Sequence, residues 1–111
     1  MILDFVGQPI LPGCYVAQSG RGNTTSEYGM ILYKVIGVEP EGKIKVVRLK
    51  IRYSGNTTSI RTYKTTLRSR KVCVITPIAK TKDLFERALN GSLSPEEIRG
   101  AVSWLHRGTP L

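Results

Sequence analysis

The sequence predicts a mainly β protein, in which five short antiparallel strands form a partly open barrel and a hairpin of two helices follows. Three observations support this class. β-Branched and aromatic residues alternate with polar ones over much of residues 14–75, and clusters of turn residues divide this region into short runs. From about residue 79 the apolar period becomes helical. With 111 residues for a single core, we expect one domain, with the barrel at 1–78 and the helical hairpin at 79–111 packed on it.

The strands are bounded by turn residues. Pro12-Gly13 opens the first strand, and a polar loop at 19–27 follows it. Glu39-Pro40-Glu41-Gly42 makes a tight turn after the second strand, and residues 54–59 form the turn after the third. Thr76-Pro77 closes the last strand. The expected strands are, in order, 14–18, 29–38, 43–53, 60–66 and 71–75.

The third strand changes its alternation halfway along. Lys43 and Lys45 alternate with apolar residues, but after Val46-Val47 the basic residues occupy even positions. Since a slip of one residue turns every side chain to the other face, we expect a bulge or sharp bend near Val46. Long strands of small barrels bend in this way as they pass between sheets.

The helical hairpin has clear boundaries. Asn90-Gly91 is a helix stop, and Ser94-Pro95-Glu96-Glu97 is a capping box that starts the second helix at Pro95. A DNA-reading helix-turn-helix is disfavoured, because Glu96 and Glu97 lie at the end that would approach the major groove. The apolar stripes are Leu84, Phe85, Ala88 and Leu89 in the first helix, and Ile98, Ala101, Val102 and Leu105 in the second.

Five short strands with tight turns favour an SH3-like barrel, with an OB-fold as the close competitor. The SH3-like type is preferred because the strands are short and no helix-length segment separates the third from the fourth.

Positive charge is concentrated in one segment. Residues 42–82 contain 12 of the 17 lysines and arginines and no aspartate or glutamate. A positive field built on a sheet is typical of a protein that binds a polyanion, most often nucleic acid; the alternative is an ordinary hydrated surface. The side chains assigned to the outward field are Arg48, Lys50, Arg52, Arg61, Lys64, Arg68, Arg70 and Lys71.

A pentapeptide repeat provides a second functional signal. Gly22-Asn23-Thr24-Thr25-Ser26 recurs as Gly55-Asn56-Thr57-Thr58-Ser59. In an antiparallel meander the two loops emerge at the same end of the sheet, where hydroxyls, amides and main-chain donors would lie beside arginine and contact phosphates. The candidate contacts from these loops are Arg21, Asn23, Thr24, Thr25, Asn56, Thr57 and Thr58.

The residues favour backbone-directed binding of double-stranded DNA with low sequence specificity. Single strands are disfavoured, because base stacking needs exposed aromatics and the basic region has only Tyr53, expected to point inward, and Tyr63. The rival hypothesis is a small adaptor whose basic face docks on an acidic host protein, such as a polymerase or nuclease, with Trp104 as candidate contact. A third alternative is an assembly component that contacts a packaged genome.

Residues 12–53 contain Pro12-Gly13-x-x-Val16, then a polar loop, and then Gly29-x-Ile31 followed by alternating Val and Ile. This arrangement resembles the KOW and wider SH3-like barrel families of transcription and translation factors, and also small barrel proteins encoded by bacteriophages. It implies that the first hairpin loop, including Arg21, engages nucleic acid or polymerase. The long Thr-rich loop and the helical tail depart from the family pattern.

No enzymatic motif is evident. His106 has no visible partner, and the sequence contains neither a phosphate-binding glycine motif nor clustered acids for a cation. We expect a non-enzymatic protein without catalytic residues, cofactor or metal. Cys14 and Cys73 are expected to be buried reduced thiols. Without a membrane span or secretory leader, a cytoplasmic location is expected, which includes the cytoplasm of an infected host cell.

Overall fold

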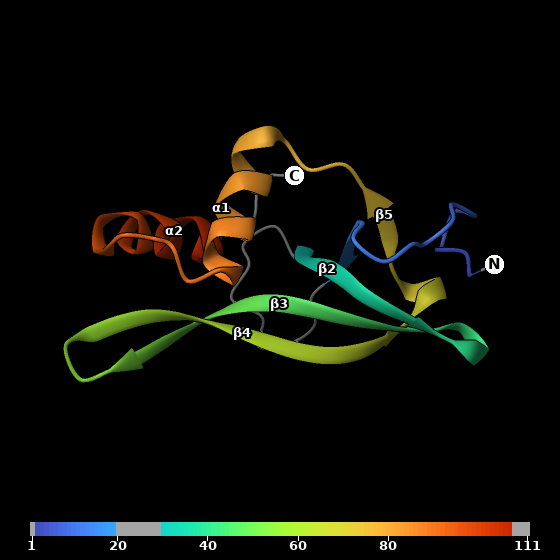
Figure 1. Cartoon of the computed structure of the whole chain (residues 1–111), viewed down its shortest axis with the longest axis horizontal. Coiled ribbons are helices and arrows are strands. Elements are labelled where there is room, and N and C mark those ends of the chain that lie inside the picture. Colours follow the sequence, from blue (N-terminus) through green and yellow to red (C-terminus); the bar gives the residue numbers. More distant parts are fainter. Residues whose placement is uncertain (1, 20–29, 108–111) are drawn as a thin grey trace.

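A computed structural model describes residues 2–19 and 30–107 (Figure 1). Five antiparallel strands form one sheet in the order β4-β3-β2-β1-β5, and two helices follow, so a mainly β fold with a helical tail is confirmed. In the described part of the chain no ladder joins β4 to β5. The elements are β1 (Tyr15–Ser19), β2 (Met30–Glu39), the 3₁₀ turn η1 (Pro40–Gly42), β3 (Lys43–Ser54), β4 (Thr57–Arg68), the 3₁₀ turn η2 (Ser69–Lys71), β5 (Cys73–Ile75), α1 (Ala79–Leu89) and α2 (Pro95–Arg107).

Strand β2 is shared between two parts of the sheet. Its residues 30–34 pair with β1, which also pairs with β5, whereas its residues 34–39 pair with β3. The register between β2 and β3 shifts between Val35 and Gly37, so that Ile36 is an extra residue in β2. The β2 strand therefore changes its pairing partner close to a bulge.

Both faces of the sheet bury apolar side chains. On one face Val16, Val35, Ile44 and Val46 share a core that Ile10 and Val72 complete. On the other face Tyr15, Leu32 and Leu49 pack against Phe85 of α1, which is only 1% exposed. Adjacent residues such as Tyr15 and Val16 are both buried, because they point to opposite covered faces.

The change of alternation in β3 has a different cause from the one expected. Strand β3 pairs with β4 without any shift over all 12 residues, so β3 has no bulge near Val46; the bulge beside Val46 lies in the partner strand β2, between Val35 and Gly37. Ile44 and Val46 face the first core, whereas Leu49 faces the second. The apolar positions change parity because the hairpin packs first one face and then the other face against the body.

The turn between β3 and β4 is shorter than expected. Only Gly55 and Asn56 form it, and Ser54 pairs with Thr57. Gly55 has a φ of 59°, which a type II′ turn requires at its first central position and which glycine adopts at low cost. In the second copy of the repeated pentapeptide, the first two residues thus form the turn and the last three belong to β4. Strand β4 begins three residues earlier than expected.

Helix α1 ends and helix α2 begins where the sequence indicates. Gly91, with a φ of 67°, follows α1, and Ser92 N donates to Arg87 O at 2.9 Å. The capping box is formed in both directions, from Glu97 N to Ser94 Oγ and from Ser94 N to Glu97 Oε1, each at 3.2 Å.

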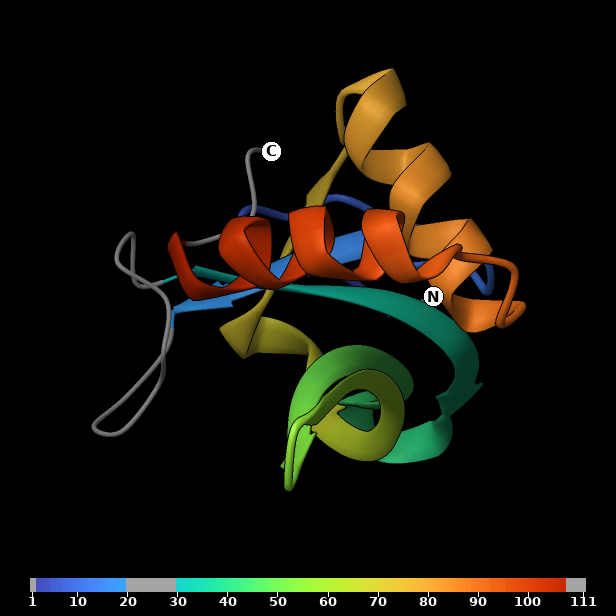
Figure 2. The same ribbon diagram turned by 90° about the vertical axis from the view of Figure 1, so that its left-hand side faces the viewer.

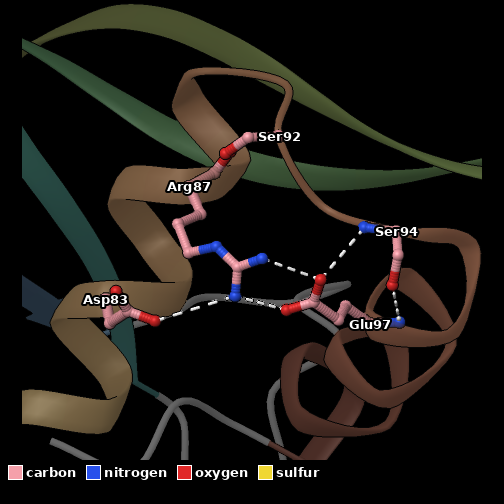
Figure 3. Close-up of polar contacts among 5 residues, drawn as sticks. All are labelled: Asp83, Arg87, Ser92, Ser94 and Glu97. Atoms are coloured by element: carbon pink, nitrogen blue, oxygen red, sulfur yellow. Dashed lines mark hydrogen bonds and ion pairs between the residues drawn. The ribbon is translucent and has the colours of Figure 1, made fainter.

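A bidentate ion pair links the two helices (Figure 3). The Arg87 guanidinium donates to both carboxylate oxygens of Glu97, with Nη2 2.8 Å from Oε1, and lies 3.9 Å from Asp83. Hydrogen bonds from Arg87 and from the Ser94 backbone lower the pKa of Glu97 below its ordinary value. One glutamate therefore caps α2 and holds it to α1.

Helix α1 is fixed to the sheet by a mixed apolar and polar contact. The rings of Tyr15 and Phe85 meet edge to face at 5.5 Å. Glu86 accepts hydrogen bonds from the Tyr15 hydroxyl and, at 2.6 Å, from Lys34 Nζ. These bonds from Lys34 and Tyr15 lower the pKa of Glu86, while burial and the Glu86 carboxylate raise the pKa of Tyr15 well above its ordinary value.

The N-terminal segment is held by a buried carboxylate that the sequence analysis did not single out. Asp4 is 0% exposed. Its Oδ1 accepts from the backbone N–H groups of Val6 and Gln8 at 3.0 and 2.7 Å, and its Oδ2 accepts from Val74 N of β5 at 2.6 Å. The Gln8 side chain also donates to Oδ2, at 3.0 Å. Asp4 thus closes a turn and ties it to the sheet.

The last strand is shorter than expected. Strand β5 begins at Cys73 and not at residue 71, because residues 69–71 form η2. Cys14 and Cys73 are free thiols, but they are half-buried rather than buried. In the described ranges, no helix combines the length and the apolar character needed to cross a membrane.

Candidate nucleic-acid interface

The β3–β4 hairpin lies along one side of the molecule, and both helices, β1 and β5 lie on its other side. Figures 1 and 2, which differ by a quarter turn, both show this arrangement. In Figure 2 the hairpin is seen end-on and its two strands coil around each other. Strong twist is expected of a two-stranded ribbon. One side of the hairpin thus faces the rest of the protein, and the other side faces away from it.

Along β3 the exposed positions switch from odd-numbered to even-numbered residues, and the buried positions switch the other way. Lys43 and Lys45 are exposed where even-numbered residues of β3 are buried, and Lys50 and Arg52 are exposed where Leu49 is buried. Basic residues thus follow the outward direction of the coiled hairpin. We call this surface the outer side; its cations are Lys43, Lys45, Arg48, Lys50, Arg52, Arg61, Lys64 and Arg68.

Ion pairs among the described residues neutralise little of this charge. Among the described residues, Lys45 is the only outer-side cation with an ion pair, to Glu39 at 3.4 Å. The carboxylates of α1 and α2 that form ion pairs do so with Lys34 and Arg87, which lie elsewhere. Neither β3 nor β4 contains an acidic residue. The outer side therefore keeps a positive field available to an anionic partner.

The strand register determines which of the basic side chains are neighbours. Lys50 pairs with Arg61, and Arg48 pairs with Tyr63, so these four share one face of the hairpin, with Arg52 opposite Ser59. At the other end, Lys43 pairs with Arg68 and Lys64 with Val47, on the opposite face. The twist of the ribbon is what turns both sets toward the outer side.

Two of these side chains show features that matter for a ligand. Lys50 Nζ lies 4.4 Å from the centre of the Tyr63 ring, a cation–π contact. Arg48 is half-buried, and its Nε–H is enclosed without a hydrogen-bond acceptor in the described structure. Because the Nε atom is enclosed, an external anion would meet the terminal nitrogens of Arg48 and not this N–H.

Two of the basic residues predicted to contact nucleic acid lie beyond the hairpin. Arg70 and Lys71 are exposed in η2, next to the base of β4. Arg70 Nη1 lies 3.5 Å from the Asp4 carbonyl oxygen, so this side chain also contacts the N-terminal turn. The structure therefore places Arg70 and Lys71 beside the end of the outer side rather than on it.

The repeated pentapeptides are only partly described. Asn56, Thr57 and Thr58 lie at the free end of the hairpin, where Thr57 shares a face with Ser54. Arg21, Asn23, Thr24 and Thr25 lie outside the described residues, as do the loop contacts expected from them. Trp104 belongs to α2, but its side chain is also outside the described part.

The structure adds functional candidates that the sequence analysis did not select. Tyr63 is 49% exposed and shares the hairpin face of Arg48. Phe5 and Val6 are 71% and 60% exposed at the turn that Asp4 holds. The signal for this turn was present in the sequence, since Asp4 and Gly7 occupy the first and fourth positions that a type I turn favours.

A scan against protein-family models and searches of curated proteins and of solved structures find no match to this chain.

Proposed function

We propose that this protein is a non-enzymatic nucleic-acid-binding protein with an SH3-like barrel, which binds double-stranded DNA through the phosphate backbone with low sequence specificity. The observation that carries the proposal is the outer side of the hairpin, where eight cations from two strands follow the outward direction and only Lys45 has an internal ion pair among the described residues. Lysine and arginine on a regular surface are the groups that position a protein on phosphates.

The strand arrangement supports the SH3-like assignment. Strand β2 leaves β1 to pair with β3, so it serves two parts of the sheet, and the 3₁₀ turn η2 lies between β4 and β5. Apolar side chains from both parts meet in one core with Val16 and Ile44. A bent strand that passes between two small sheets around a shared core is the architecture of small antiparallel barrels.

The size of the outer side fits a short segment of duplex. A 12-residue strand spans at most roughly 40 Å at about 3.3 Å per residue. At about 3.4 Å per base pair this corresponds to at most roughly 12 base pairs. The outer side is therefore long enough to contact about five phosphates.

The salt dependence of binding tests this proposal. If about five phosphates are neutralised, the logarithm of the association constant for a duplex falls with the logarithm of the salt concentration at a slope of roughly −4 to −5. Fluorescence anisotropy with a labelled duplex at several salt concentrations measures this slope. A binding constant that does not change with salt would contradict the proposal.

A second candidate function, docking on an acidic protein surface, is favoured by the N-terminal turn. Phe5 and Val6 are large, exposed and apolar, and Arg70 contacts the same turn. Aromatic and arginine side chains are enriched in the energetic centres of protein interfaces. Such a contact would suit a partner with an apolar pocket and negative charge.

The variant Phe5→Ser distinguishes the two candidates, because it removes exposed apolar surface and leaves every cation in place. The DNA-binding proposal expects its duplex affinity to equal that of the wild type within about twofold, since Phe5 contacts no phosphate there. The same anisotropy titration measures it. The second candidate would be favoured by a different result: the wild type does not bind duplex, it forms a nuclease-resistant complex with an acidic protein, and Phe5→Ser abolishes this complex.

A further inference from the structure

The far half of the hairpin, residues 48–54 and 57–63, is a two-stranded ribbon to which no third strand pairs among the described strands. The pairing of β3 with β2 ends at Val47, whereas its pairing with β4 continues to Ser54 and Thr57. In the described structure this half is therefore bounded by strand edges on both sides. It ends in the two-residue turn at Gly55 and Asn56.

The two faces of this ribbon differ in what covers them. On one face Leu49 belongs to the core with Phe85, and Ile60 packs against that core. Figure 1 shows both helices on this side of the hairpin. The opposite face, which we call the uncovered face, has no helix or further strand packed on it among the described elements, and all its side chains but half-buried Arg48 and Ser59 are exposed. It carries mainly basic and hydroxyl side chains, namely Arg48, Lys50, Arg52, Ser54, Thr57, Ser59, Arg61 and Tyr63.

From these features we infer that the far half of the hairpin enters the major groove of B-form DNA with this uncovered face toward the bases. The inference rests on the proposed function and specifies its ligand. A two-stranded ribbon fits a major groove about 12 Å wide, whereas a minor groove about 6 Å wide is too narrow. Seven residues per strand extend roughly 23 Å at about 3.3 Å per residue, which matches a local segment of one groove.

The side chains on the uncovered face suit this position. Serine and threonine hydroxyls bond to several different base edges, and lysine and arginine side chains within the groove neutralise the phosphates that line it, so this position agrees with low sequence specificity. At the near half of the hairpin, Lys43, Lys64 and Arg68 remain on the outer side, where they would contact the flanking phosphates. Helix packing on the covered face keeps the ribbon from bending away from the duplex.

The same geometry predicts discrimination between DNA and RNA. The major groove of A-form RNA is deep and narrow, so a ribbon cannot enter it. An RNA duplex of the same sequence should therefore bind roughly tenfold or more weakly than the DNA duplex at equal salt. Equal affinities for the two duplexes would overturn the inference.

Disulfide exchange with tethered thiols tests the groove directly. Thr57→Cys places a thiol on the uncovered face, and Thr62→Cys places one on the opposite face of the same strand; both threonines are exposed. Each variant is mixed with duplexes that carry a mixed-disulfide tether either on cytosine N4, in the major groove, or on guanine N2, in the minor groove. The protein thiolate attacks the tether, joins the DNA sulfur and releases the small thiol.

We expect the Thr57→Cys protein to cross-link to the major-groove tether at least roughly tenfold faster than to the minor-groove tether. The Thr62→Cys protein should show no such preference, and the wild type, with only half-buried Cys14 and Cys73, gives the background rate. Equal cross-linking of Thr57→Cys to both tethers, in a protein that binds the duplex, would overturn the inference and leave the proposed function intact. Absence of duplex binding at every salt concentration would contradict both this inference and the proposed function.

Discussion

Replacement of Lys50, Arg52 and Arg61 by glutamine is expected to weaken duplex binding by on the order of 10²- to 10³-fold at about 0.1 M salt. Each lost phosphate contact removes the release of about 0.9 counterion, which is worth roughly eightfold in affinity at this salt concentration. The three side chains are exposed, lie on one face of the hairpin and form no ion pair within the described residues, so their loss should leave the fold unchanged.

The matched control is the triple variant of Lys80, Lys82 and Arg99 to glutamine. It removes the same charge from exposed positions on α1 and α2, away from the outer side. Its affinity should fall by less than about tenfold, through the general field of the protein alone. Equal losses in the two variants, with unchanged circular dichroism and melting temperatures, would show that net charge rather than the outer side controls binding.

Substitution of Asp4 by alanine is expected to lower the free energy of unfolding by about 2–4 kcal/mol. The change removes the acceptor of the backbone N–H groups of Val6, Gln8 and Val74. An unsatisfied donor costs about 1–3 kcal/mol where it is buried, and less at Val6 and Gln8, which are exposed to water. Urea unfolding followed by circular dichroism measures the loss. A difference below about 0.5 kcal/mol, the usual range of surface substitutions, would contradict the structural role of Asp4.

The role of Asp4 also has a pH signature. Burial raises the pKa of this carboxyl, but hydrogen bonds from Val74, Gln8 and Val6 outweigh it and lower the pKa below the ordinary 3.8. The stabilisation is therefore fully present above about pH 4 and is lost as the pH falls through the lower, folded-state pKa. Asp4→Asn, which does not titrate, should be less stable than the wild type at pH 7 and approach it in acid. A stability difference constant with pH would contradict this account.

The helical tail could be predicted closely from the sequence because its signals are local. The capping box of Ser94 and Glu97 and the stop at Gly91 depend on residues within a few positions of each other. The link between Arg87 and Glu97 depends on how the two helices pack, so no local pattern indicates it.

The pairing and orientation of the long strands were harder to predict from the sequence, because they depend on packing between residues far apart in the chain. The change of parity in β3 was visible in the sequence, but the sequence does not reveal that each half of the strand packs a different face. A bulge or sharp bend near Val46 was therefore expected in β3, whereas the bulge is at Ile36 in β2. Strand pairing across a sheet is decided by partners far away in the chain.

The candidate site was predicted in composition but not in arrangement. The basic segment identifies the outer-side cations, but the expected long turn after β3 left the register of β4 undefined. With the two-residue turn at Gly55, Tyr63 pairs with Arg48 and becomes part of the exposed face. The parity of a strand follows from the length of the turn before it.

Nuclear magnetic resonance mapping of the protein with a short DNA duplex tests the central claim most directly. The account predicts that the largest backbone amide shift changes occur along β3 and β4, at Lys50, Arg52 and Arg61, and that Lys80, Lys82 and Arg99 on the helices change little. Shift changes concentrated on α1 and α2, with the hairpin amides unaffected at saturating duplex, would contradict it.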